Sequence, residues 1–253
     1  PGQRGETADM GASIIIELPE NDCRTRWRMT LTNATQDEVG TVHFPALDGL
    51  WLGETWADDV LVLPRFAGWQ VVNPTQKLAM QRITWKWQEY LYPYLLNEMC
   101  GTEDARGAHV KHLPYSGECS MLWMDVYDPT ERPGIYMTCR TSGTHMMGLR
   151  VESFGEECPG VGLAITDHHE PVDLVPEGVP VADPWESESC VVAFHEGDWH
   201  WAADEYRAWF EGVHVPIPQA HRPDWFMESA GLMAHYDFQY QGGGIVHRYR
   251  DIP

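Results

Sequence analysis

Five side chains between residues 56 and 69 have the chemistry to bind a polyhydroxylated ligand. The segment Trp56-Ala-Asp58-Asp59 is followed closely by Arg65 and Trp69. Carboxylates accept hydrogen bonds from sugar hydroxyls, and an indole ring packs against the apolar C–H face of a sugar. We therefore predict ligand contacts at these five residues: Trp56, Asp58, Asp59, Arg65 and Trp69. The alternative interpretation is a solvated acidic turn between two strands.

Two histidine-containing segments raise the question of a metal site. His109 and His112 have HxxH spacing, and Asp167-His168-His169-Glu170 is a dense run of candidate ligands. A metal ion needs three or four converging groups, whereas neighbouring residues on a strand point to opposite faces. We interpret these histidines as surface residues and predict no metal site.

Signatures of cofactor binding and of a serine nucleophile are absent from the sequence. It lacks the GxSxG motif of serine hydrolases and the GxGxxG and P-loop motifs of nucleotide-binding proteins. The glycine run at 242–244 lacks the strand–turn–helix context that cradles phosphate. We therefore expect no cofactor.

The composition narrows the class of partner. The 253 residues include 17 Lys and Arg against 38 Asp and Glu, a formal net charge of -21. Such a surface repels phosphate backbones and acidic lipid, which argues against nucleic acid and membrane as partners and favours a neutral sugar or a soluble protein. Acidity that serves solubility alone is the simpler alternative. The 12 Trp and 10 Tyr suit sugar stacking or, alternatively, a β-sandwich core.

The cysteines do not form a metal or disulfide framework. They stand singly, without a CxxC motif, at Cys23, Cys100, Cys119, Cys139, Cys158 and Cys190. This spacing argues against a zinc ribbon and against a dense disulfide scaffold. We expect free buried thiols, with one or two disulfides as the alternative.

Short strands separated by turns account for most of the chain. Arg24–Thr32 shows the pattern best, with Trp27 and Met29 on one face and Arg26 and Arg28 on the other. A period of two over this length indicates a strand. Many short strands with Gly, Pro and Asp turns predict an antiparallel β-sandwich. The sequence also predicts strands at Ser13–Leu18, Glu38–Phe44, Gly49–Leu52, Val60–Leu63, Met80–Glu89, Ser120–Tyr127, Gly134–Cys139, His145–Phe154, Gly160–Asp167 and Ser189–His195, and a long loop at Asn97–Pro114.

The pattern changes to a helical one after residue 197. In Trp199–Gly212 apolar residues recur at i, i+3, i+4 and i+7, which predicts one face of an α-helix and core packing for its aromatic residues. Asp198 can accept the free N–H groups of the first turn, and Gly212 suits the left-handed position after the helix. A proline-containing connector follows, and the apolar segment Ser229–Asp237 is predicted to be a strand.

Several segments, taken in order, carry a resemblance to a known family. They are Leu52-Gly53, Asp58-Asp59, Pro64, Gly68, Asn73-Pro74, Leu113–Asp128, Pro133–Tyr136, Gly197–Asp204 with Tyr206, Arg207 and Trp209, and Ser229–Pro253. Together these segments resemble the N-terminal β-sandwich, linker helix and first barrel strand of a family of uncharacterised glycoside-hydrolase-like proteins. That family is related in fold to the α-galactosidase clan, and the resemblance spans nearly the whole chain.

The resemblance implies a mainly β fold, in which a large antiparallel β-supersandwich precedes a linker α-helix and the first strand of a (β/α)8 barrel. The implied domains are a sandwich at 1–197, a helix and connector at 198–228, and an incomplete barrel at 229–253. Such barrels need roughly 250 residues, so both catalytic carboxylates of the related clan would lie beyond Pro253, and no catalytic residue is assigned. His235 and Asp237 would end the first barrel strand, where they would contact substrate or simply cap the strand.

Two classes of function follow from these observations. The first is the non-catalytic sandwich of a glycoside hydrolase, which shapes the cleft of a barrel in the same or an associated chain for a carbohydrate substrate. The alternative is a stand-alone carbohydrate-binding module or a structural assembly module, and either class is compatible with an oligomer. A self-contained module has no use for the apolar strand Ser229–Asp237, because its backbone groups need neighbouring strands.

Overall fold

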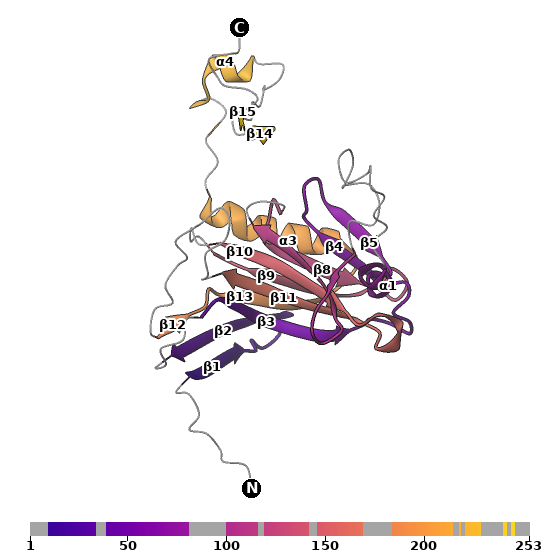
Figure 1. Ribbon diagram of the computed structural model, residues 1–253. Helices are drawn as coiled ribbons and strands as arrows, with labels where there is room; N and C mark the ends of the chain where they lie inside the picture. Colours follow the sequence, from indigo (N-terminus) through magenta and orange to yellow (C-terminus); the bar gives the residue numbers. More distant parts are fainter. Residues whose placement is uncertain are drawn as a thin grey trace. The chain divides into compact units, whose positions relative to one another are not determined.

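The computed structural model describes residues 10–33, 39–80, 100–115, 119–141, 146–168, 184–214, 218, 221–228, 240–241 and 244–245. Contacts divide the chain into two compact units, Pro1–Phe210 and Glu211–Pro253. The first unit is mainly β and contains two antiparallel sheets, called sheet A and sheet B below (Figure 1). A sandwich-like fold, as predicted, is therefore confirmed for this unit.

In the described part of the chain, sheet A has eight strands and sheet B has five. Sheet A runs in the order β1 (Met10–Glu17), β2 (Arg24–Asn33), β13 (Cys190–Glu196), β9 (Pro133–Cys139), β8 (Trp123–Tyr127), β4 (Val60–Leu63) and β5 (Trp69–Val72), and β12 (Trp185–Glu186) also pairs with β2. Sheet B runs in the order β3 (Thr41–Leu50), β11 (Val161–His168), β10 (Met147–Ser153), β7 (His109–Tyr115) and β6 (Thr102–Glu103).

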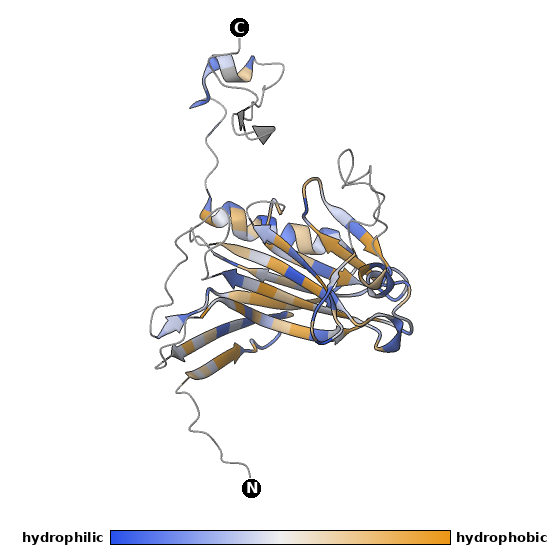
Figure 2. Ribbon diagram, viewed as in Figure 1, coloured by the Kyte–Doolittle hydropathy of each residue, from blue (hydrophilic) through white to orange (hydrophobic). Residues whose placement is uncertain are grey.

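The main hydrophobic core lies between the two sheets. Leu61 and Met124 of sheet A and Leu149 and Ile165 of sheet B are fully buried in one cluster. Because side chains alternate along a strand, polar and apolar residues alternate in several strands, as the colours of Figure 2 show. Full burial of an aliphatic side chain stabilises the fold by roughly 1.5–3 kcal/mol, so this cluster fixes how the sheets face each other.

The opposite face of sheet A is covered by α3 (Trp199–Val213), as the helical periodicity predicts. Ala202 and Tyr206 of α3 are buried in a second cluster with residues of sheet A, and Trp199 and Trp209 pack against it, which confirms the predicted core packing for part of this helix face. The prediction fails for Phe210, which is 41% exposed. Asp198 caps the helix as predicted, since its Oδ1 accepts the backbone N–H of His200 at 3.0 Å. The prediction for Gly212 was wrong: the helix continues through it, in an exposed stretch where nothing forces a left-handed residue.

Two further predictions are corrected by sheet B. The predicted loop Asn97–Pro114 contains β6 and β7, which pair with each other, and β7 also pairs with β10. Its polar residues concealed the strand, because one face of β7 is directed away from the core. The predicted strands Glu38–Phe44 and Gly49–Leu52 give way to one strand, β3, which continues through Pro45. Register shifts against β11 accommodate this proline, as expected for an edge strand with a bulge.

Short helical elements connect the strands. Asn73-Pro74 starts α1 (Pro74–Ala79), and the Asn73 side chain accepts the N–H of Gln76 at 3.1 Å. This helix was not predicted, because six residues are too few to show a helical period. A single 3-10 turn, η1 (Gly155–Glu157), lies between β10 and β11.

The second unit contributes few described elements. They are α4 (Asp224–Met227) and the antiparallel pair β14 (Tyr240–Gln241) and β15 (Gly244–Ile245). The predicted barrel strand Ser229–Asp237, with His235 and Asp237, lies outside the described residues and stays a prediction, and so does nearly all of the predicted strand Met80–Glu89. Among the described helices, none has the length and apolarity needed to span a membrane.

The packing of α3 predicts unequal effects of truncating two aromatic residues of this helix. Tyr206→Ala removes a buried ring from the sheet A–α3 cluster and should lower the free energy of unfolding by about 3–5 kcal/mol, the range for a buried aromatic residue. Phe210→Ala, on the same helix but 41% exposed, should cost less than about 1 kcal/mol. Chemical denaturation measures both values, and equal losses would contradict the packing described here.

Candidate functional site

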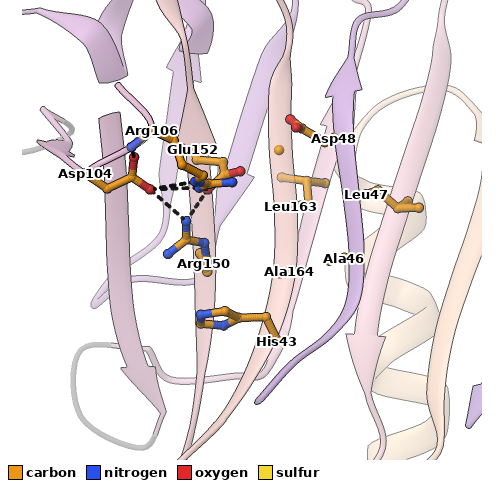
Figure 3. A pocket seen from close by; sticks show the side chains of 11 residues that line it. His43, Ala46, Leu47, Asp48, Asp104, Arg106, Arg150, Glu152, Leu163 and Ala164 are labelled. Carbon is orange, nitrogen blue, oxygen red and sulfur yellow. Dashed lines mark hydrogen bonds and ion pairs between the residues drawn. The ribbon is translucent and has the colours of Figure 1, made fainter. Parts of the chain in front are cut away.

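The candidate functional site is a cleft on the face of sheet B that is directed away from the core, called the sheet B cleft below. Its volume is about 420 Å³, and strands β3, β10 and β11 and the loop after β6 line it (Figure 3). The lining residues are His43, Ala46, Leu47, Asp48, Asp104, Arg106, Arg150, Glu152, Gly162, Leu163 and Ala164.

Small residues keep the floor of the cleft open. Ala46 pairs with Ala164 across β3 and β11, and Gly162 pairs with Glu152 across β11 and β10. A Cβ atom on Gly162 would lie 2.6 Å from Cγ of Glu152 and 3.0 Å from Oδ1 of Asp48. Only glycine therefore fits between these two carboxylate side chains without a shift.

An ion-pair network forms one wall of the cleft, and the dashed lines of Figure 3 mark it. Arg106 donates from Nη2 to Glu152 Oε2 at 2.6 Å and to Asp104 Oδ2 at 2.8 Å, and Arg150 also donates to Glu152. Burial alone would raise the pKa of Glu152, but hydrogen bonds from Arg106 and then Arg150 outweigh it and lower the pKa. Glu152 therefore stays ionised, and the network holds its side chains in fixed positions.

Neutral imidazole rings extend this wall. His43 stacks on His112, with ring centroids 5.8 Å apart, and Arg150 Nη1 lies 3.1 Å from His112 Nε2. Burial, and next the charge of Arg150, lower the pKa of His43 and lower that of His112 to about 4. Both rings are therefore uncharged near pH 7, and the Nε2 of His112 can accept the Arg150 hydrogen bond.

This arrangement is suited to binding rather than to proton transfer or metal chemistry. The three carboxylates and two guanidinium groups of the lining nearly balance in charge and offer both acceptors and donors. Glu152 is a poor general base, because the hydrogen bonds that Arg106 and Arg150 donate to its Oε2 lower its pKa. Within the described ranges, no group of three or more His, Cys, Asp or Glu residues is placed to hold a metal ion.

The structure brings Arg65 and Trp69, two of the predicted ligand residues, together at a different place. The Cζ of Arg65 lies 4.0 Å from the centroid of the Trp69 ring, and Arg65 is only 4% exposed. Trp69 lines a second cleft of about 260 Å³, called the aromatic cleft below, together with Phe66, Trp123 and Trp199. Arg65 is buried and stacks against Trp69 in a cation–π contact.

The other predicted ligand residues line neither cleft. Asp59 is buried, and its Oδ2 accepts the N–H of Leu52 at 3.1 Å, while Asp58 Oδ2 lies 3.3 Å from the hydroxyl of Thr130. Trp56, half-buried, belongs to the same loop. These contacts fix the loop between β3 and β4, and ligand binding by Trp56, Asp58 and Asp59 stays a prediction.

Sequence reasoning missed the charged residues of the sheet B cleft. Arg150 and Glu152 are two residues apart on one strand, so they share a face, but their partners Asp104 and Arg106 lie in a segment predicted to be loop. His112 was noted only as part of an HxxH pair. The sequence feature that could have identified this cleft is the pair of opposite charges two residues apart, Arg150 and Glu152, in an otherwise largely apolar strand.

Comparison with known proteins places the chain in no family. No protein-family model matches the sequence. No curated protein matches it significantly.

The burial of Asp59 predicts a pH-dependent stability. Burial raises the pKa of Asp59 from 3.8 to about 7, so the folded protein binds one more proton than the unfolded chain between these values. Stability should therefore fall as pH rises from about 4 to about 7, and Asp59→Asn should lessen that fall while keeping the hydrogen bond from Leu52. Urea unfolding at pH 4.5 and pH 7.5 measures both proteins, and identical pH slopes would contradict this assignment.

Proposed function

We propose that this chain binds a neutral carbohydrate in the sheet B cleft, as the non-catalytic β-sandwich of a glycoside-hydrolase-like protein. The observation that carries the proposal is the cleft itself, a preformed hollow with fixed polar groups of balanced charge above a floor of small residues. The resemblance stated from the sequence supplies the glycoside-hydrolase context.

The size and charge of the cleft support a small neutral ligand. A volume of about 420 Å³ lies in the range of small-molecule sites. Because Arg106 and Arg150 are already paired with Glu152 and Asp104, most of their positive charge is neutralised before an anionic ligand arrives. The net charge of the chain, -21, further opposes an anion. A sugar, whose hydroxyls both donate and accept, needs no net positive charge in the cleft.

The two sides of the cleft offer a sugar two kinds of contact. The carboxylate of Asp48 can accept hydroxyl protons, while Arg106 and Arg150 have further N–H groups to donate. Ala46 and Ala164 present apolar surface to the C–H face of a ring (Figure 3). Because the ion pairs hold the polar groups in place before binding, little conformational entropy is lost when a ligand enters.

The second part of the proposal, a glycoside-hydrolase barrel, concerns residues that the structure does not describe. It requires alternating strands and helices, with carboxylates at the ends of the strands, in sequence that continues after Pro253. Within the first unit, α3 covers one face of sheet A and sheet B covers the other, so the cleft-bearing face of sheet B is left for ligand. A stand-alone binding module would use the same cleft but would lack the barrel sequence.

The cleft assignment is tested by filling the cleft with a side chain. Ala46 is exposed and lines the cleft, so Ala46→Phe should block the ligand site while the core keeps its packing. Isothermal titration with a panel of neutral monosaccharides and oligosaccharides should show binding to the unmodified protein and at least about tenfold weaker binding to Ala46→Phe. Ala12→Phe, at an exposed alanine of β1 that lines neither cleft, is the matched control and should bind normally.

Two outcomes would contradict the proposal in different ways. If no glycan in the panel binds the unmodified protein, carbohydrate binding itself is wrong. If Ala46→Phe binds normally and Trp69→Ala abolishes binding, carbohydrate binding stands but its site is the aromatic cleft. Thermal melting of each variant shows whether a loss of binding reflects a loss of fold.

A further inference from the structure

Two free cysteines lie directly opposite each other on neighbouring strands of sheet A. The antiparallel register of β9 and β13 pairs Cys139 with Cys190. Both side chains are directed into the core between the sheets, because both belong to the cluster that packs against sheet B. Their sulfur atoms therefore lie on the same face of the same strand pair.

The local hydrogen-bond pattern decides how close the two residues are. The N–H of Arg140 donates to the carbonyl of Ser189 at 3.0 Å, so Arg140 and Ser189 form a hydrogen-bonded pair. Hydrogen-bonded and non-hydrogen-bonded pairs alternate along antiparallel strands, so the adjacent pair, Cys139 and Cys190, is a non-hydrogen-bonded one. In such pairs the Cα atoms are about 4.5 Å apart. Disulfides span Cα separations of about 4.4–6.8 Å. The backbone thus already has a spacing that a disulfide accepts.

The surroundings of the two thiols keep the reduced pair inert in the folded protein. Cys139 and Cys190 are fully or almost fully buried, and Cys190 Sγ lies 3.7 Å from the carbonyl oxygens of Phe44 and Glu188. A hydrogen bond between the two thiols, and next their burial, raise the pKa of Cys139. Little thiolate therefore forms at Cys139, and the burial of both sulfur atoms keeps a dissolved oxidant from them unless β13 and β9 separate.

We propose that Cys139 and Cys190 close into a cross-strand disulfide when the chain folds in the presence of a low-molecular-weight disulfide such as oxidised glutathione. One cysteine thiolate attacks a glutathione sulfur, which forms a mixed disulfide and releases one glutathione thiolate. The second cysteine thiolate then attacks the protein sulfur of the mixed disulfide, which forms the Cys139–Cys190 bond and releases the second glutathione. The pair loses two electrons and two protons, and two reduced glutathione molecules carry them.

The bond would join two strands on which much of sheet A depends. β9 and β13 are central strands, and β13 leads directly into α3. The crosslink closes the chain from residue 139 to residue 190, which limits the unfolded ensemble and should raise the Tm by several degrees. It leaves the sheet B cleft unchanged, because neither cysteine lines it.

The test uses the full chain with its two exposed cysteines replaced, Cys23→Ser and Cys158→Ser, so that intermolecular bonds do not form. The protein is unfolded, refolded in a glutathione buffer, alkylated under denaturing conditions and digested for mass spectrometry. The expected product is two hydrogen atoms lighter and contains one linked peptide pair, Cys139 with Cys190. Cys100 and Cys119, which are also buried, should be alkylated and serve as internal references.

The matched controls are Cys139→Ala and Cys190→Ala, each of which should leave the partner cysteine alkylated and remove the rise in Tm. Circular dichroism of the oxidised protein should match that of the reduced protein. The proposal is overturned if both cysteines are alkylated after refolding in every glutathione ratio, if a bond forms with Cys100 or Cys119 instead, or if the linked product has lost the folded spectrum.

Discussion

The structure depends on the burial of the central strands of sheet A on both faces. Sheet B covers one face through the Leu61–Met124 cluster, and α3 covers the other through Ala202 and Tyr206. Strands buried on both faces are apolar along most of their length, and β4 and β8 are buried from end to end. Sheet B, in contrast, has one face in the core and an outer face that no described element covers. That asymmetry makes the outer face of sheet B the place where polar groups can gather.

The charged groups on the outer face of sheet B come from segments far apart in the sequence, and the pairing of the strands brings them together. Glu152 and Arg150 lie on β10, and their partners Arg106 and Asp104 come from the loop after β6. Because β6 pairs with β7 and β7 pairs with β10, these segments come together across a sequence separation of more than forty residues. Removing one partner would leave a half-buried charge uncompensated, so the network specifies one geometry for the cleft wall.

How much the sequence predicts depends on whether the pattern is local. The helix Trp199–Val213 and the strand Val60–Leu63 follow from periodicity within a few residues, and both were predicted. The sheet B cleft depends on which strands are neighbours, which no local period encodes. The aromatic and acidic residues at 56–69 can be recognised in the sequence, but their contacts in the fold cannot. Arg65 is buried against the ring of Trp69, whereas Asp59 is buried in a contact with the backbone of Leu52.

A buried polar pair explains why α3 sits in one position on sheet A. His195 Nε2 lies 2.8 Å from Asp125 Oδ1, and both side chains are inaccessible to solvent. The His195 ring stacks on Trp201 of α3, with centroids 4.6 Å apart and planes 4° from parallel. Gly134 makes room for it, since a Cβ there would lie 2.2 Å from the imidazole. An apolar surface alone would let the helix slide, whereas the indole of Trp201 stacks on the imidazole of His195, which Asp125 holds in place, at one helix position.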